Sequence, residues 1–196
     1  MKQLCMDSAY KYLVIGLYED KKLVKGIAKE AFKRQSETIF VELNALLKEA
    51  GWTYREIDEV VITKGPGSYT GIRIAMTIAK VLCTQTKAAC YTISTMALYA
   101  GSQKANVILD ARGNRAYVAR VDQGTCVQGP MILPLEQIET WLEEESGLLL
   151  GDGSLIGREA QPVDFLENFV QAQWEKVDNV HALVPDYLKE SDAYKV

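Results

Sequence analysis

Histidine is nearly absent from this chain, and its cysteines lack the spacing of a metal site. The 196 residues contain one histidine, and no two of the four cysteines stand in a C-x-x-C pair. The residues concerned are His181, Cys5, Cys83, Cys90 and Cys126. Structural zinc sites need clusters of such ligands. The sequence therefore predicts no metal of its own and no disulfide framework, and we expect buried thiols in a reducing compartment.

Long apolar runs and an excess of basic charge are also missing. No stretch approaches the ~20 apolar residues of a membrane span, and Asp7 and Lys11 interrupt the N-terminal segment where a signal peptide needs an apolar run. A formal net charge of −4 argues against unaided binding of nucleic acid. With 48% hydrophobic residues, the chain is expected to be globular and cytoplasmic.

Basic residues form their best cluster near the N-terminus. This basic cluster consists of Lys21, Lys22, Lys25, Lys29, Lys33 and Arg34. Lysines that protect an exposed strand edge from pairing explain the cluster more simply than an RNA-binding role does.

The most informative segment is Gly65–Arg73, which reads Gly-Pro-Gly-Ser-Tyr-Thr-Gly-Ile-Arg. It separates an apolar strand from an apolar helix, so it predicts a sharp turn whose N–H groups favour an anion. A P-loop would continue with Lys-Ser/Thr, a dinucleotide loop would place its third glycine one residue earlier, and a nucleophile elbow would have serine where Tyr69 stands. We therefore interpret Gly65, Gly67 and Gly71 as structural, with Ser68 or Thr70 capping the next helix.

The order of predicted elements occurs twice along the chain. Strands are expected at 4–6, 12–18, 23–28, 59–63 and 89–93, with helices at 36–50, 72–83 and 94–100. After a polar break, strands are expected at 106–109, 115–121, 126–133 and 148–150, with a helix at 134–145. This repetition predicts an α/β fold with an N-terminal lobe over 1–100 and a reduced C-terminal lobe over 104–196.

The predicted helix 72–83 is apolar over an unusually broad arc, about 220° of its circumference. Packing against a sheet accounts for about half of such an arc. Either the helix 36–50 hides the remainder, or part of it is a surface for another protein. The pattern alone leaves both explanations open.

Carboxylates stand at the ends of predicted strands in both halves. Asp7 and Asp110 each end a strand, and Gly151-Asp152-Gly153 forms a third acidic turn. Acidic turns facing a cleft suit a nucleotide with bound magnesium. For each aspartate alone, a turn-capping role is the simpler interpretation.

Four of these motifs together resemble the bacterial TsaB family, also called YeaZ, which helps to make threonylcarbamoyladenosine (t6A) next to the anticodon of tRNA. They are Gly65–Arg73, Asp110-Ala111-Arg112, Gly151-Asp152-Gly153 and Pro185-Asp186-Tyr187-Leu188. The resemblance covers nearly the whole chain and rests chiefly on the glycine-rich motif. It implies an actin/Hsp70-like ATPase (ASKHA) fold with two related lobes, the second truncated.

The resemblance also implies a non-catalytic role with protein partners. In the family, the paralogue TsaD carries the metal and transfers the threonylcarbamoyl group to tRNA, TsaB binds TsaD through two helices of its first lobe, and the ATPase TsaE joins them. Contact with tRNA is then indirect, and ATP with magnesium belongs to the complex. The matching helices here are 36–50 and 72–83, and from their pattern we predict Phe40, Leu47, Ile72 and Met76 at the partner interface. A homodimer is expected when the partner is absent.

Two departures from the family pattern concern the predicted nucleotide cleft. The first strand ends in Asp7-Ser8-Ala9 where the family usually has Asp-Thr-Ser, and the chain is shorter than many members, with the shortfall in the second lobe. We therefore predict a vestigial cleft, formed by Asp7, Asp110 and the turn Gly151-Asp152-Gly153. The alternatives are a glycoprotease-like hydrolase and an ATP-dependent small-molecule kinase of the same fold.

Overall fold

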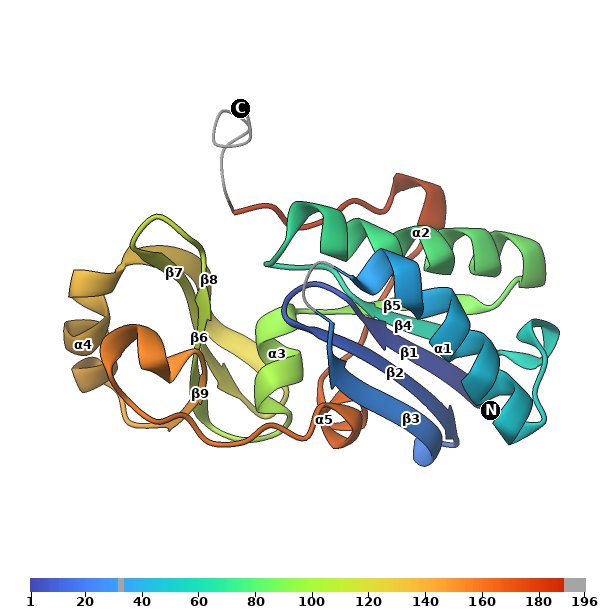
Figure 1. The fold of residues 1–196 in the computed structure, drawn as a ribbon, viewed down its shortest axis with the longest axis horizontal. Helices are drawn as coiled ribbons and strands as arrows, with labels where there is room; N and C mark the ends of the chain where they lie inside the picture. The colour runs from blue at the N-terminus through green and yellow to red at the C-terminus, as the bar shows by residue number, and fades with distance from the viewer. Residues whose placement is uncertain (32–33, 189–196) are drawn as a thin grey trace.

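Two β-sheets lie side by side in the computed structural model, which describes residues 1–31 and 34–188 (Figure 1). The first sheet has the strand order β10-β5-β4-β1-β2-β3 and the second has β8-β7-β6-β9. The first consists of β1 (Lys2–Asp7), β2 (Tyr12–Glu19), β3 (Lys22–Glu30), β4 (Glu59–Thr63), β5 (Ala89–Ile93) and β10 (Glu175–Lys176). The second consists of β6 (Ala105–Asp110), β7 (Arg115–Asp122), β8 (Thr125–Pro134) and β9 (Leu148–Gly151).

Helices separate and cover the two sheets. They are α1 (Gln35–Ala50), α2 (Tyr69–Thr86), α3 (Thr95–Ala100), α4 (Leu135–Glu144) and α5 (Phe165–Gln171), with short 3-10 turns η1 (Tyr54–Glu56), η2 (Gly153–Ile156) and η3 (Val180–Ala182). One apolar core joins α1 and α2 to the first sheet, a second joins α3 and α5 to both sheets, and a third lies beneath α4. The layers are therefore helices, sheet, helices, sheet and helix (Figure 1).

The second sheet repeats the centre of the first, as the order of elements predicts. In the first sheet, β3, β2 and β1 are antiparallel and β4 is parallel to β1. In the second, β8, β7 and β6 are antiparallel and β9 is parallel to β6. The first sheet continues with β5 and β10 beyond β4, and the second ends at β9. The expectation of two related lobes with a reduced second one is confirmed.

Local signals place the ends of the two long helices. At the end of α1, Gly51 has φ 69°, and its N–H donates to the carbonyls of Leu47 and Lys48. This left-handed residue is the C-cap that the sequence predicts. At the start of α2, the Ser68 hydroxyl accepts a hydrogen bond from the Gly71 N–H, so Ser68 is the N-cap.

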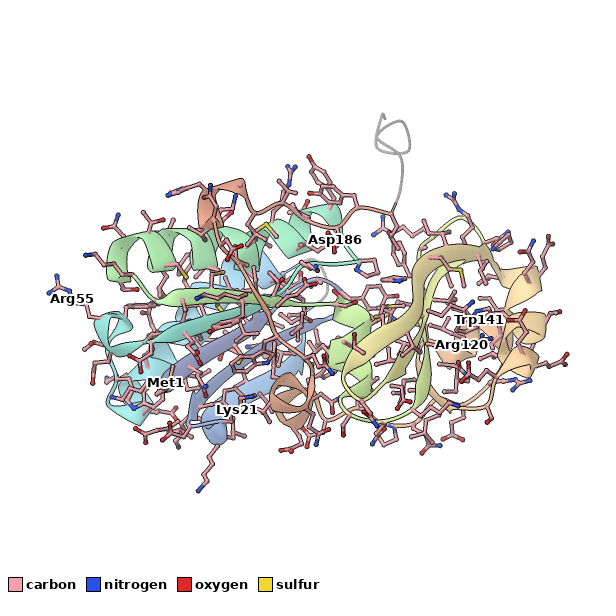
Figure 2. All side chains as sticks on the ribbon, turned by 180° about the vertical axis from the view of Figure 1, so that it is seen from behind. Met1, Lys21, Arg55, Arg120, Trp141 and Asp186 are labelled. Atoms are coloured by element: carbon pink, nitrogen blue, oxygen red, sulfur yellow. The ribbon has the colours of Figure 1, made fainter. Side chains whose placement is uncertain are left out.

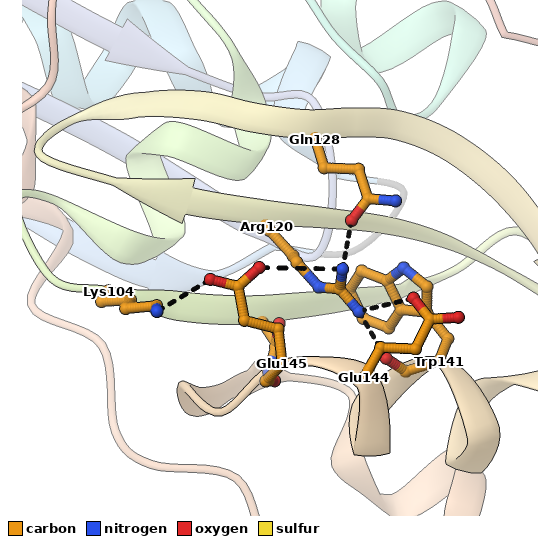
Figure 3. Close-up of polar contacts among 7 residues, drawn as sticks. Lys104, Arg120, Gln128, Trp141, Glu144 and Glu145 are labelled. Atoms are coloured by element: carbon orange, nitrogen blue, oxygen red, sulfur yellow. Dashed lines mark hydrogen bonds and ion pairs between the residues drawn. The ribbon is translucent and has the colours of Figure 1, made fainter.

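A buried arginine fastens α4 to the second sheet (Figure 3). Arg120 of β7 donates to the Trp141 carbonyl at 2.6 Å and to the Glu144 carboxylate at 3.0 Å. Its guanidinium carbon lies 4.7 Å from the centroid of the Trp141 ring. A cation at the C-terminal end of a helix satisfies carbonyls that lack a partner within the helix, which explains why this arginine is tolerated inside.

The C-terminal segment returns to the first lobe. The N–H of Gln173 donates to the Gly124 carbonyl, and the N–H of Val177 donates to the Cys90 carbonyl. Between these bonds, β10 pairs antiparallel with β5. Asp186 lies beside the N-terminal end of α2 (Figure 2). The predicted second lobe, residues 104–196, therefore contributes the strand β10 to the first sheet.

The cysteines are free thiols, three of them buried and Cys126 partly buried. Within residues 1–31 and 34–188, no group of three or more His, Cys, Asp or Glu side chains is placed to hold a metal ion. None of the helices in this same part of the chain combines the length and apolar character that crossing a membrane requires.

Candidate docking surface and interlobe cleft

The glycine-rich loop is packed against the turn that follows β1. A Cβ atom on Gly67 would lie 2.3 Å from the Ala9 carbonyl oxygen, and one on Gly71 would lie 2.2 Å from the Ser8 carbonyl oxygen. Real Cβ atoms do not come that close, so only glycine fits at either position. The loop N–H of Ser68 donates to the Ala9 carbonyl at 2.7 Å. Part of the predicted anion cradle is thus satisfied by the protein itself.

Ser68 and the histidine lie far apart. The Ser68 hydroxyl is engaged as the N-cap of α2, whereas the His181 carbonyl accepts a hydrogen bond from Lys80 at 3.1 Å. Lys80 stands twelve residues further along α2, which at 1.5 Å per residue is about 18 Å. A serine nucleophile needs its base within hydrogen-bond reach. The geometry agrees with the structural interpretation of this serine.

Two of the motifs that define the family resemblance meet in space. The phenol of Tyr187 accepts a hydrogen bond from Arg73 Nε at 2.7 Å, and its ring stacks on Tyr69 with centroids 5.0 Å apart. The Asp186 N–H donates to the Lys64 carbonyl at 2.7 Å. The late Pro-Asp-Tyr-Leu motif therefore clamps the glycine-rich loop and the first turn of α2, a role that the sequence did not reveal.

Asp7 lies at the end of β1, buried from solvent. Its carboxylate accepts hydrogen bonds from the Thr63 hydroxyl and, at 2.9 Å, from the Ala9 N–H. Burial nevertheless raises the pKa of this carboxyl to about 6, because removing a charge from water outweighs the two donors. Asp7 thus caps its own turn, the simpler of the two interpretations.

Asp152 joins the two lobes. Its carboxylate accepts hydrogen bonds from the Tyr10 phenol and from the Lys11 ammonium group, both on the turn after β1. The Asp110 N–H, at the end of β6, donates to the same carboxylate and to the Tyr10 oxygen, each at 2.9 Å. Burial, with the bond to Asp152, raises the pKa of the Tyr10 phenol. We call Tyr10, Lys11, Asp110 and Asp152 the interlobe clasp.

The structure brings only part of the predicted cleft together. Asp110 and Asp152 share the clasp, and Gly151 and Gly153 flank Asp152 on the turn between β9 and η2. Asp7 instead faces Thr63 within the first lobe. The sequence analysis missed Tyr10 and Lys11, because nothing in a Tyr-Lys pair on a turn signals a partner more than a hundred residues away.

The predicted partner interface needs a correction. Phe40 is 55% exposed, but Leu47, Ile72 and Met76 are buried in the core between the helices and the first sheet. The apolar arc of α2 is broad because the sheet, α1, η1 and the C-terminal segment around η3 all pack against this helix, and the last of these adds Val180 and Leu183 to the core. Three of the four predicted residues are therefore core residues, unavailable at the surface.

Apolar side chains do remain exposed on the outer faces of α1 and α2. Phe40 and Val41 are exposed on α1, Val81 is 60% exposed on α2, and Ile74, two helical turns before Val81, is half-buried. The two helices lie on the same face of the first sheet (Figure 1). We call these four residues the outer helix patch. Exposed apolar side chains on two neighbouring helices make this face a candidate protein interaction site.

Acidic residues of α1 form ion pairs with part of the basic cluster. Lys25 pairs with Glu49 at 3.5 Å, and Lys29 pairs with Glu42. Lys33 lies outside the described residues. Since β3 is the edge strand of its sheet, lysines there fit the edge-protecting role.

The doubled sheet with its crossing C-terminal segment defines an α/β protein of the actin/Hsp70-like ATPase (ASKHA) class. Residues 22–138 match the family model described as "TsaD: tRNA N6-adenosine threonylcarbamoyltransferase". The chain therefore belongs to this family, and its near full-length curated relatives are named TsaB.

Individual relatives agree with that assignment. The chain is 25% identical to the tRNA threonylcarbamoyladenosine biosynthesis protein TsaB of Bacillus subtilis, over 98% of this chain and 96% of the relative. It is 24% identical to TsaB of Escherichia coli, over 100% of this chain and 97% of the relative. Among solved structures, YeaZ from Pseudomonas aeruginosa superposes with a TM-score of 0.75 at 17% identity, covering 95% of this chain and 99% of that one, which supports the fold.

Proteins of the ASKHA class characteristically hold a nucleotide with magnesium between their lobes, but two of the three carboxylates predicted for this role do not fit that ligand. Asp152 is already neutralised by Lys11 and bonded to Tyr10. Asp7 is buried and satisfied by Thr63 and its own turn. Magnesium requires carboxylates that are free to face solvent and phosphate.

Proposed function

We propose that this chain is a non-catalytic subunit that binds and orders a TsaD-type threonylcarbamoyltransferase in the formation of t6A on tRNA. The names of the TsaB relatives support the pathway, and their near full-length similarity supports the same role here. We propose a cytoplasmic location, no cofactor of its own, indirect contact with tRNA through the complex, and a TsaE-type ATPase as a further partner.

The outer helix patch carries this proposal. Phe40 and Val41 on α1, with Val81 on α2, keep apolar surface in water that the fold leaves uncovered. Covering such surface contributes about 25 cal/mol per Å² to association. Two helices exposed on one protein can pack against helices of another protein, because ridges of side chains on one helix fit grooves on the facing helix.

A charge on the patch tests the proposal. We expect Val81→Glu to lower the affinity for the TsaD-type partner about 100-fold, since the carboxylate would be buried without a partner. Val127→Glu is a matched control, because Val127 on β8 is 59% exposed and belongs to the other lobe. Both proteins are titrated with the purified partner in a calorimeter. Equal affinities for the two variants would move the interface elsewhere.

The same patch is proposed to join two copies of the chain when the partner is absent. Sedimentation of the isolated protein is then expected to show a dimer that Val81→Glu dissociates and Val127→Glu preserves.

The two enzymatic alternatives receive less support. A glycoprotease-like hydrolase needs an activated nucleophile, and Ser68 serves as a helix cap about 18 Å along α2 from Lys80, the residue that bonds the His181 carbonyl. A small-molecule kinase would bind magnesium–ATP alone and lose it in Asp7→Ala. Peptidase activity that disappears in Ser68→Ala, or such ATP binding, would overturn the non-catalytic role.

A further inference from the structure

The turn Ser8–Lys11 touches three parts of the molecule at once. Towards the second lobe, Tyr10 and Lys11 bind the Asp152 carboxylate in the interlobe clasp. Tyr10 also accepts a hydrogen bond from the Asp110 N–H at 2.9 Å. The clasp therefore fixes where this turn lies with respect to the second sheet.

On its other side, the turn holds the start of α2. The Ser8 hydroxyl donates to the Gly71 carbonyl at 2.7 Å and accepts from the Ala75 N–H at 3.3 Å. The Ala9 carbonyl accepts from the Ser68 N–H at 2.7 Å. Ser8 and Ala9 are fully buried, and the glycine-rich loop approaches them too closely for any Cβ atom. A displacement of the turn must therefore move the first turn of α2.

The same turn holds the approach to α1. The side-chain amide of Gln35, the first residue of α1, is buried and donates to the Tyr10 carbonyl at 2.7 Å. The Ala31 N–H, between β3 and α1, donates to the Lys11 carbonyl at 3.0 Å. Both helices that carry the outer helix patch are thus anchored at their N-terminal ends to residues 8–11.

We infer that Asp152 is a positioning residue for the outer helix patch: by holding the turn Ser8–Lys11, the interlobe clasp sets how α1 and α2 are presented to a partner. The inference rests on the proposed function for the identity of that partner. It follows because interiors are closely packed and transmit small displacements through hydrogen-bonded contacts. The clasp lies between the two lobes, so the chain's own side chains hold them together there.

Amide hydrogen exchange on the isolated protein tests the first half of the inference. Asp152→Asn keeps the shape of the side chain but removes the charge that binds Lys11, and Tyr10→Phe removes the phenol alone. We expect either variant to accelerate exchange of the Ser68 and Ala31 amides about tenfold, since both bond to the turn. Glu139→Gln is the matched control, because Glu139 pairs with Arg158 on the second lobe. Unchanged exchange at both amides would overturn the inference.

Partner affinity tests the second half. We expect Asp152→Asn to weaken binding of the TsaD-type partner by about tenfold, within the usual range of coupling between sites, and Glu139→Gln to leave it unchanged. Faster exchange with undiminished affinity would also overturn the inference. If Val81→Glu fails to weaken binding, it is the proposed function that fails. The exchange experiment needs no partner, so it separates the two.

Discussion

The side chains of the outer helix patch and those of the interlobe clasp differ in their exposure to water. On the patch, the apolar side chains Phe40, Val41 and Val81 stay exposed to water. In the clasp, the Asp152 carboxylate is buried and bonded to Tyr10 and Lys11, and the Asp7 carboxylate within the first lobe is likewise buried and bonded. The apolar side chains can still gain free energy by leaving water, whereas the carboxylates already have hydrogen-bond partners. This contrast is the reason why we propose that the protein binds a partner with its helices.

The largest expected loss of stability distinguishes a core residue of α2 from a surface residue of the same helix. Met76 is buried in the core between α2 and the first sheet, so Met76→Glu places an unpaired charge there and should lower the free energy of unfolding by about 4 kcal/mol. Val81→Glu, one and a half helical turns away on the exposed face, should change it by less than about 0.5 kcal/mol. Urea unfolding of both variants checks the distinction. Similar losses in both would mean that the patch is part of the core.

A smaller change in folding stability is expected from the ionisation of Asp7 as the pH rises. The folded-state pKa of Asp7 is about 6 against an ordinary 3.8, so the folded protein binds the proton more tightly than the unfolded chain does. The contribution to stability is therefore fully present below about pH 3.8 and is lost as the pH rises through about 6. At about 1.4 kcal/mol per pKa unit, the loss is about 3 kcal/mol.

Asp7→Asn tests that sign. The variant cannot ionise, so its urea-unfolding stability should fall less than that of the parent protein between pH 4.5 and pH 8. Asp178→Asn, at an exposed position, serves as the control. Parallel pH profiles for Asp7→Asn and the parent would show that the Asp7 carboxyl does not control this dependence.

The smallest loss of folding stability is expected from a substitution in the basic cluster. Lys29 pairs with Glu42 on the surface between β3 and α1, and exposed ion pairs contribute about 0.2–1 kcal/mol. Lys29→Met should therefore lower stability by less than about 1 kcal/mol and leave partner binding intact. A large loss of affinity for tRNA in this variant would show that the cluster binds RNA after all.

Elements whose signals are local could be predicted from the sequence. The strands, the two long helices and the C-cap at Gly51 follow from apolar periodicity and from the freedom of glycine to adopt a positive φ. The repeated order of elements likewise predicted the doubled sheet. The two-residue strand β10 was missed, because Glu175–Lys176 becomes a strand only through pairing with β5.

The candidate site was predicted less well, for a physical reason. A helical wheel shows which side of α2 is apolar but not how many neighbours cover it. Here Val180 and Leu183, which are distant in sequence, pack against the core that contains α2. Ile72 and Met76 were therefore mistaken for surface residues. The clasp between Lys11 and Asp152 escaped prediction because tertiary folding alone brings those two turns together.

The central claim is that the exposed apolar side chains of α1 and α2 form the surface that meets the transferase. Calorimetric titration of a purified TsaD-type partner into the Val81→Glu and Val127→Glu proteins tests it most directly, since the two valines are 60% and 59% exposed and differ in lobe. The account predicts that binding weakens about 100-fold in the first protein and is retained in the second. Undiminished binding by the Val81→Glu protein would contradict it.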